Sequence, residues 1–159
     1  MKKVFLKPGD IYVGKAPAEV STVLGSCVSI TMFSERLKLG AICHALLPSG
    51  HTSRDRDKFH YVDSSILSML SMFEKMGVKS GELEIKLLGG GDMFERISGN
   101  TISVGTKNIE TALQVLKNNN LELTGSDVGG TMGRKIYFCT RTGKVLIKRI
   151  RSVSQGGGL

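Results

Sequence analysis

A cysteine and a histidine stand at the outer ends of two neighbouring apolar segments. Cys27 comes directly before residues 28–33, which are rich in β-branched and large side chains, and His44 follows residues 39–42 closely. The short polar break at 34–36 predicts a β-hairpin. If its loop is even and symmetric, residues whose numbers sum to 71 are paired, so Cys27 lies opposite His44 with Cβ atoms about 4.5–5.5 Å apart. A slip of one residue would put the two side chains on opposite faces.

These two residue types at such a separation can act as a nucleophile and its base. A free thiol has a pKa of about 8.5, and a neighbouring imidazole can take its proton, so we expect a lowered pKa for Cys27. Backbone N–H groups near Gly25 and Ser26 can stabilise a developing oxyanion. The hydroxyl of Ser21 or of Thr22 can orient the imidazole. The spacing alone also fits the alternative of a buried structural cysteine and a core histidine.

The composition predicts one globular domain. The 159 residues, 40% of them hydrophobic, suit a single domain with its own core. No run approaches about 18 apolar residues, and the apolar stretch near the N-terminus is too short for a signal peptide. We therefore expect a cytoplasmic protein with no membrane insertion. Three cysteines without a C-x-x-C pair argue against a disulfide framework and a metal site, and Cys43 and Cys139 are expected in the core.

The formal net charge is +8, which favours an acidic partner. Lys and Arg residues are scattered, aromatic residues make up only 6% of the chain, and no nucleic-acid-binding motif is present. A nucleic-acid-binding domain is therefore disfavoured.

Apolar periodicity predicts two helices, at 61–76 and 106–119. Strands are predicted at 4–6, 11–13, 20–24, 28–33, 39–42, 83–88, 121–124, 135–140 and 145–150. This tally indicates an α/β (α+β) fold in which layered mixed β-sheets carry two main helices packed against them. We expect one domain over 1–152 and a flexible C-terminal tail at 153–159.

Three glycines at 89–91 lead into Asp92. They lack the pattern of a phosphate-binding loop, so we interpret them as a place of close backbone packing beneath the site. Asp92 is a turn-stabilising residue or another candidate for the third catalytic group.

Four motifs combine into a more specific pattern. They are Leu24-Gly25-Ser26-Cys27-Val28; Gly40-Ala41 with His44 and Leu47-Pro48; Gly89-Gly90 with Met93-Phe94; and Asp127-x-Gly129-Gly130-x-x-Gly133-Arg134. In this order, over about residues 11–150, they resemble the CheD family, the chemoreceptor glutamine deamidases of bacterial and archaeal chemotaxis.

The resemblance implies that selected glutamine side chains on the cytoplasmic helices of chemoreceptors are hydrolysed to glutamate with release of ammonia. It implies Cys27 as nucleophile, His44 as general base and no cofactor. The family's third residue is a hydroxyl-bearing one six positions before the cysteine, which is Ser21 here, with Thr22 beside it as the alternative. A CheC-type phosphatase is the implied protein partner. The competing hypothesis is a non-catalytic interaction module that binds this phosphatase or the receptor.

Overall fold

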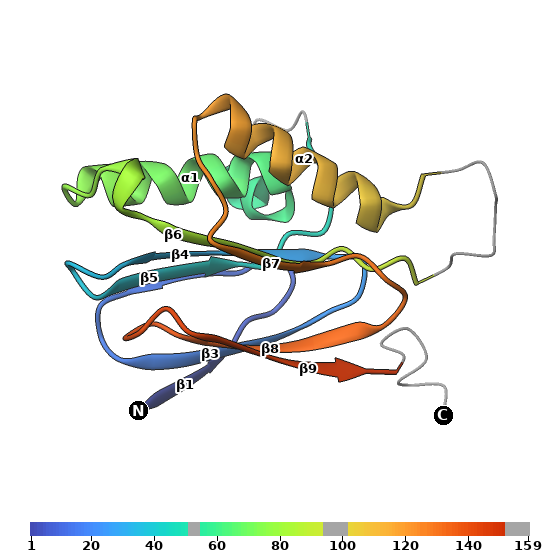
Figure 1. Ribbon diagram of the computed structural model, residues 1–159, viewed down its shortest axis with the longest axis horizontal. Helices are drawn as coiled ribbons and strands as arrows, with labels where there is room; N and C mark the ends of the chain where they lie inside the picture. Colours follow the sequence, from blue (N-terminus) through green and yellow to red (C-terminus); the bar gives the residue numbers. More distant parts are fainter. Residues whose placement is uncertain (51–54, 94–101, 152–159) are drawn as a thin grey trace.

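The computed structural model describes residues 1–50, 55–93 and 102–151. Two β-sheets are stacked face to face, and two helices cover the outer face of one of them (Figure 1). The four-stranded sheet has the order β1-β3-β8-β9 and the five-stranded sheet the order β2-β5-β4-β6-β7. Each sheet contains parallel and antiparallel pairs, so the expected α+β fold with layered mixed sheets is confirmed.

The strands are β1 (Lys2–Phe5), β2 (Ile11–Gly14), β3 (Ala18–Leu24), β4 (Val28–Ser34), β5 (Leu39–Cys43), β6 (Glu84–Gly89), β7 (Gly125–Val128), β8 (Gly133–Cys139) and β9 (Val145–Ile150). The helices are α1 (Val62–Lys75) and α2 (Val104–Asn118), with short 3-10 helices η1 (Asp55–His60) and η2 (Ser80–Glu82). No helix in the described ranges is long and apolar enough to cross a membrane.

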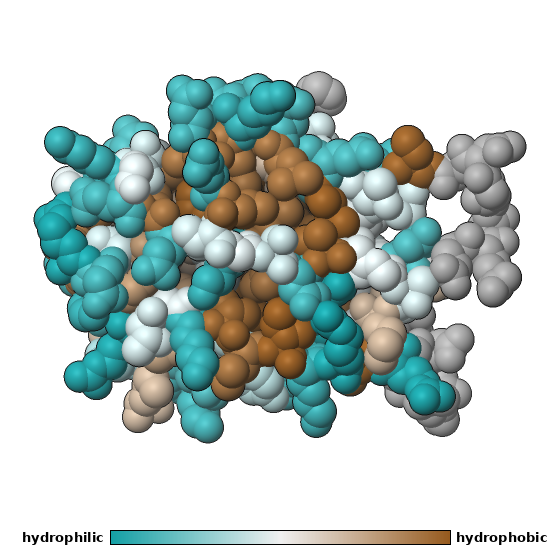
Figure 2. Space-filling model, viewed as in Figure 1, coloured by the Kyte–Doolittle hydropathy of each residue, from teal (hydrophilic) through white to brown (hydrophobic). Residues whose placement is uncertain are grey.

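The central strands of the five-stranded sheet, β4 and β5, are buried on both faces because both faces are covered. β4 is buried along its whole length, with the helices on one side and the four-stranded sheet on the other. β3, in contrast, alternates between buried and half-buried residues, as expected for a strand with one face on the core. On the face seen in Figure 2, apolar side chains gather in two bands separated by a paler strip at the level of β7.

The hairpin of β4 and β5 forms, but its register differs from the expectation by two residues. Ser34 pairs with Leu39, so the loop comprises residues 35–38, and Lys38 takes a left-handed φ of 51° there. Paired numbers therefore sum to 73, and Cys27 is not directly opposite His44. The shift is even, so the side-chain alternation that places both residues on one face is kept.

Two further predictions were wrong. Residues 121–124 form a connection rather than a strand, because Leu121 is buried against the end of α2 and its N–H bonds to Leu116 O; the strand begins at Gly125. Cys139 is half-buried on the face of β8 opposite that of the buried Phe138, not in the core. Cys43 is fully buried on the helix side, as expected. The predicted tail at 153–159 lies outside the described residues.

Candidate functional site

A threonine and the histidine meet between the two sheets. Thr22, on β3 of the four-stranded sheet, lies with its Oγ1 2.7 Å from His44 Nδ1 and 2.7 Å from Leu6 O. His44 directly follows β5 of the five-stranded sheet, and its backbone is held by Gly9 and Asp10. Both side chains are buried, Thr22 fully and His44 to all but 3%. The pair therefore depends on the stacking of the two sheets.

The hydrogen bonds assign the proton on the imidazole. Leu6 O can only accept, so the single hydroxyl hydrogen of Thr22 points to it. Thr22 Oγ1 must then accept from His44, which places a hydrogen on Nδ1 and leaves the lone pair on Nε2. A neutral His44 in this tautomer is prepared to accept a proton at Nε2.

Of the two hydroxyl residues singled out in the sequence, Thr22 is the one placed against the imidazole. Ser21 is the next residue on the same strand, so its side chain points to the opposite face. It is only half-buried, while its neighbours Val20 and Thr22 are fully buried on the inner face. Ser21 contributes its carbonyl, which accepts from Leu6 N and so holds the segment that receives the Thr22 hydroxyl.

Cys27 lies on the same side of the five-stranded sheet as this pair. It packs against the cluster of Leu24, Leu88 and Ile136, which fills the space between the sheets. Thr22 stands between Val20 and Leu24 on the inner face of β3, so the Thr22–His44 pair borders this cluster. Across the described residues, no hydrogen bond joins Cys27 Sγ to the imidazole.

The loop that carries Cys27 has all three of its carbonyls fixed on one side. Gly25 O accepts from Gly91 N at 2.9 Å, and Cys27 O accepts from Gly90 N at 2.9 Å. Ser26 O accepts from the side chain of Asn108 at 2.9 Å. In a trans peptide the N–H points away from the preceding C=O, so the N–H groups of Ser26 and Cys27 are directed to the other side. Within the described ranges neither of these N–H groups donates a hydrogen bond to another residue.

The interpretation of the glycine run as close backbone packing agrees with this geometry. Gly89 and Gly90 have φ values of 101° and 68°, which favour glycine. A Cβ on Gly89 would lie 2.4 Å from Cys27 O, so no other residue lets the two segments approach this closely.

Burial makes both the imidazole and the thiol uncharged at rest. It lowers the pKa of His44 to about 4, although the charge of Asp10 and the nearby backbone of Leu6 act to raise it. Burial also raises the pKa of Cys27, with only partial compensation from the residue's own N–H. The expectation of a lowered pKa for Cys27 was therefore wrong, because a thiolate in this site is poorly solvated and faces no imidazolium.

The other two thiols differ strongly from each other. Complete burial raises the pKa of Cys43 to about 12. For Cys139, partial burial acts to raise the pKa, but hydrogen bonds from Thr142 and the backbone near Arg141, with the Arg141 charge, outweigh it and lower the pKa. The most acidic thiol lies away from His44. Among the described residues, no group of His, Cys, Asp and Glu is arranged to hold a metal ion.

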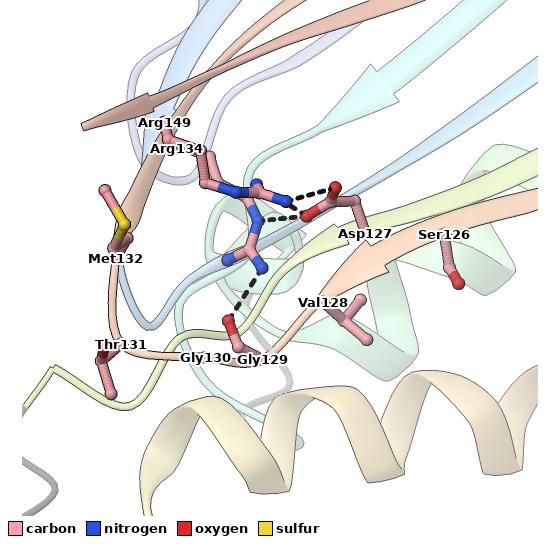
Figure 3. Close-up of a pocket in the computed structure, with 9 residues that line it drawn as sticks. All are labelled: Ser126, Asp127, Val128, Gly129, Gly130, Thr131, Met132, Arg134 and Arg149. Carbon is pink, nitrogen blue, oxygen red and sulfur yellow. Dashed lines mark hydrogen bonds and ion pairs between the residues drawn. The ribbon is translucent and has the colours of Figure 1, made fainter. Parts of the chain in front are cut away.

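A polar groove of about 610 Å³ lies beside the Cys27 loop. As Figure 3 shows, Arg134 and Arg149 both point to Asp127, and Arg134 also donates to Gly129 O at 2.8 Å. These hydrogen bonds, that from Arg149 above all, hold the pKa of Asp127 below its ordinary value against the effect of burial.

This groove is joined to the Cys27 loop by one short segment. Asp92 N donates to Gly130 O on the groove at 2.8 Å, while the preceding residue, Gly91, donates to Gly25 O. Asp92 is thereby placed between groove and loop. The hydrogen bond at Nδ1 of His44 is made with Thr22.

Sequence reasoning missed Asn108 and Leu6. Asn108 is a fully buried polar residue on an otherwise amphipathic helix, and a polar residue on the apolar side of a predicted helix was the available signal. Leu6 acts through its backbone carbonyl, for which the sequence has no signal.

Comparison with known proteins places the chain in one class, proteins of chemotactic signal transduction. A family model described as CheD chemotactic sensory transduction matches residues 46–149. A probable chemoreceptor glutamine deamidase CheD 2 from Geobacter sulfurreducens is 50% identical over 147 residues, covering 92% of this chain and 89% of that protein. Probable chemoreceptor glutamine deamidases CheD from Maridesulfovibrio salexigens and Pyrococcus horikoshii are 42% and 39% identical, each over 158 residues. They cover 94% and 98% of this chain, and 93% and 96% of their own lengths.

This chain belongs to the CheD family. The span matched by the family model begins after Cys27 and His44, whereas the aligned relatives cover 92–98% of the chain.

Proposed function

We propose that this protein is a chemoreceptor glutamine deamidase in which Cys27 is the nucleophile, His44 the base and Thr22 the group that orients the base. The observation that carries the proposal is the hydrogen-bonded series from Leu6 O through Thr22 Oγ1 to His44 Nδ1, on the side of the sheet where Cys27 lies. The near full-length relatives named as deamidases supply the substrate class.

The first half of the reaction forms a thioester. Sγ of Cys27 attacks the carboxamide carbon of the glutamine while its proton passes to Nε2 of His44. Because both groups are uncharged at rest, this proton moves during the attack rather than before it. The N–H groups of Ser26 and Cys27 stabilise the negative oxygen that develops. His44 then returns the proton to the leaving nitrogen, and ammonia departs.

The second half restores the enzyme. His44 takes a proton from water as the water attacks the thioester carbon, and the thiol leaves with that proton. Glutamine and water thus become glutamate and ammonia. These steps need no metal or organic cofactor. Thr22 keeps the hydrogen on Nδ1 throughout, so that Nε2 serves as base in both halves.

The charge of the groove favours an acidic helix as the substrate. Two arginines and one aspartate give it a net charge of +1 (2 − 1), and the whole chain carries +8. Such a surface attracts acidic helices, and we infer that the substrate is a cytoplasmic helix of the receptor and that the protein acts in the cytoplasm. The family resemblance also implies a CheC-type phosphatase as a partner. Its effect on the deamidation rate is measured by adding it to the assay.

The proposal is tested with a cytoplasmic fragment of a chemoreceptor. Ammonia release and conversion of glutamine to glutamate, read by peptide mass spectrometry, are expected from the wild-type protein. Cys27→Ala abolishes both signals, and His44→Ala lowers the rate by about 10²–10⁴-fold. Cys139→Ala is the matched control and keeps full activity. A wild-type protein that binds receptor or phosphatase but releases no ammonia would leave the interaction module as the function.

A further inference from the structure

Among the described residues, Asn108 is the one whose side chain forms a hydrogen bond to the loop of Cys27. It projects from α2 and is fully buried. Its Nδ2 donates to Ser26 O at 2.9 Å and to Leu46 O at 3.0 Å. Its Oδ1 has no hydrogen-bond partner in the described structure. The two carbonyls fix the orientation of the amide, since the opposite orientation would bring three oxygens together.

The two carbonyls belong to the two halves of the site. Ser26 precedes Cys27, and Leu46 lies two residues beyond His44. One amide group therefore joins the segment of the nucleophile to the segment of the base. The other donors to the loop, from Gly90 and Gly91, are backbone groups.

α2 is pressed directly onto this region. A Cβ at Gly105, one turn before Asn108, would lie 2.3 Å from Gly91 O and 2.6 Å from Gly90 O. The absence of a side chain there lets the helix come close enough for Asn108 to reach Ser26. A buried acceptor left without a partner is costly, so the unpaired Oδ1 indicates that the residue is retained for its two donors.

We infer that Asn108 is a positioning residue for the oxyanion site; the inference rests on the proposed function and deepens it. By holding Ser26 O, Asn108 turns the Ser26–Cys27 peptide so that the Cys27 N–H faces the other side. There it donates to the oxygen that receives the carbonyl electron pair when Sγ bonds to the substrate carbon. Loss of one such donor slows acyl transfer by about 10²–10³-fold.

The experiment compares two reactions of the same thiol. Acyl transfer needs the oxyanion donor, whereas alkylation by iodoacetamide forms no oxyanion. In Asn108→Ala we expect kcat for receptor deamidation to fall by about 10²-fold with KM within threefold, and the rate of Cys27 alkylation to stay within threefold of wild type. Asn118→Ala, on the exposed end of the same helix, is the matched control and changes none of these rates.

A second assay makes the result independent of the receptor. Acylation of the enzyme by p-nitrophenyl acetate, corrected for the Cys27→Ala background, also passes through an oxyanion and is expected to fall in parallel in Asn108→Ala. If the wild type deamidates no receptor but Asn108→Ala still slows this acylation, the proposed function fails and the positioning role stands. Equal acylation rates in the two proteins would overturn the positioning role.

If Asn108→Ala does not fold, Asn108→Asp is used instead, because it keeps the size of the side chain. Burial raises the pKa of such a carboxyl, and only its protonated form can donate to Ser26 O. The kcat of Asn108→Asp per folded molecule should therefore rise as the pH falls from 8 to 5.5, whereas that of the wild type should not. A wild-type pH profile in this variant would contradict the inference.

Discussion

Replacing Thr22 by valine removes the hydroxyl from the centre of the site and keeps the shape of the side chain. Leu6 O and the Nδ1–H of His44 then both lose their partner in a buried place. Each unpaired buried group costs about 1–3 kcal/mol, so the free energy of unfolding should fall by about 2–6 kcal/mol. A domain has about 5–15 kcal/mol in total, and the variant should remain folded at low temperature.

The catalytic effect of Thr22→Val follows from the tautomer. Without its acceptor the imidazole hydrogen is free to move to Nε2, which removes the base, and the ring is no longer held. We expect the deamidation rate per folded molecule to fall by about 10–10²-fold, part of the full contribution of a general base. Thr22→Ser keeps the hydroxyl and loses one methyl group, which costs about 0.8 kcal/mol, so its rate should stay within threefold.

Ser21→Ala is the matched control on the same strand. Its side chain lies on the opposite face and is half-buried, so stability should change by less than about 0.5 kcal/mol and the rate by less than twofold. Urea unfolding and ammonia release measure both quantities. An active Thr22→Val variant together with an inactive Ser21→Ala variant would refute the assignment and return the third role to Ser21.

Three further predictions concern protons and charge. Burial lowers the pKa of His44 to about 4, so its neutral form contributes stability that is complete above about pH 6.5 and is lost, by about 3 kcal/mol, as the pH falls toward 4. Urea unfolding at several pH values should show this loss, and His44→Gln should reduce it. An unchanged dependence of the unfolding free energy on pH in His44→Gln would contradict the prediction. Brief iodoacetamide treatment at neutral pH should label Cys139 before Cys27 and leave Cys43 unlabelled by mass spectrometry; preferential labelling of Cys27 would indicate a resting thiolate. Raising the ionic strength from 0.01 to 0.15 M shortens the Debye length from about 30 to 8 Å and should raise KM for an acidic receptor fragment; a constant KM would rule out electrostatic recruitment.

Much of the fold was accessible from local patterns. The two helices were predicted within about two residues of α1 and α2, because their apolar residues recur at helical spacing. The register of the hairpin was not predicted correctly, because it depends on the left-handed conformation of Lys38. No rule of composition assigns that conformation to a lysine. The strand predicted at 121–124 failed because Leu121 closes the end of α2, a tertiary contact that alternation cannot distinguish from a strand.

In the site, too, local sequence predicted some features, and tertiary packing decided the others. Cys27 and His44 were proposed from their types and spacing, but the choice between Ser21 and Thr22 depends on which face of β3 turns inward. That face is set by the stacking of the two sheets. The pKa of Cys27 was predicted in the wrong direction because its burial is a property of the packed structure.

The origin of Thr22 and His44 in different sheets has a consequence for folding kinetics. A compact intermediate with formed strands but loose side-chain packing would contain Cys27 without an oriented base. During refolding, deamidase activity should therefore return with the docking of the two sheets and later than the circular dichroism signal of the strands. A newly made or partly unfolded chain would carry the thiol in a harmless form, unable to hydrolyse the glutamines of bystander proteins.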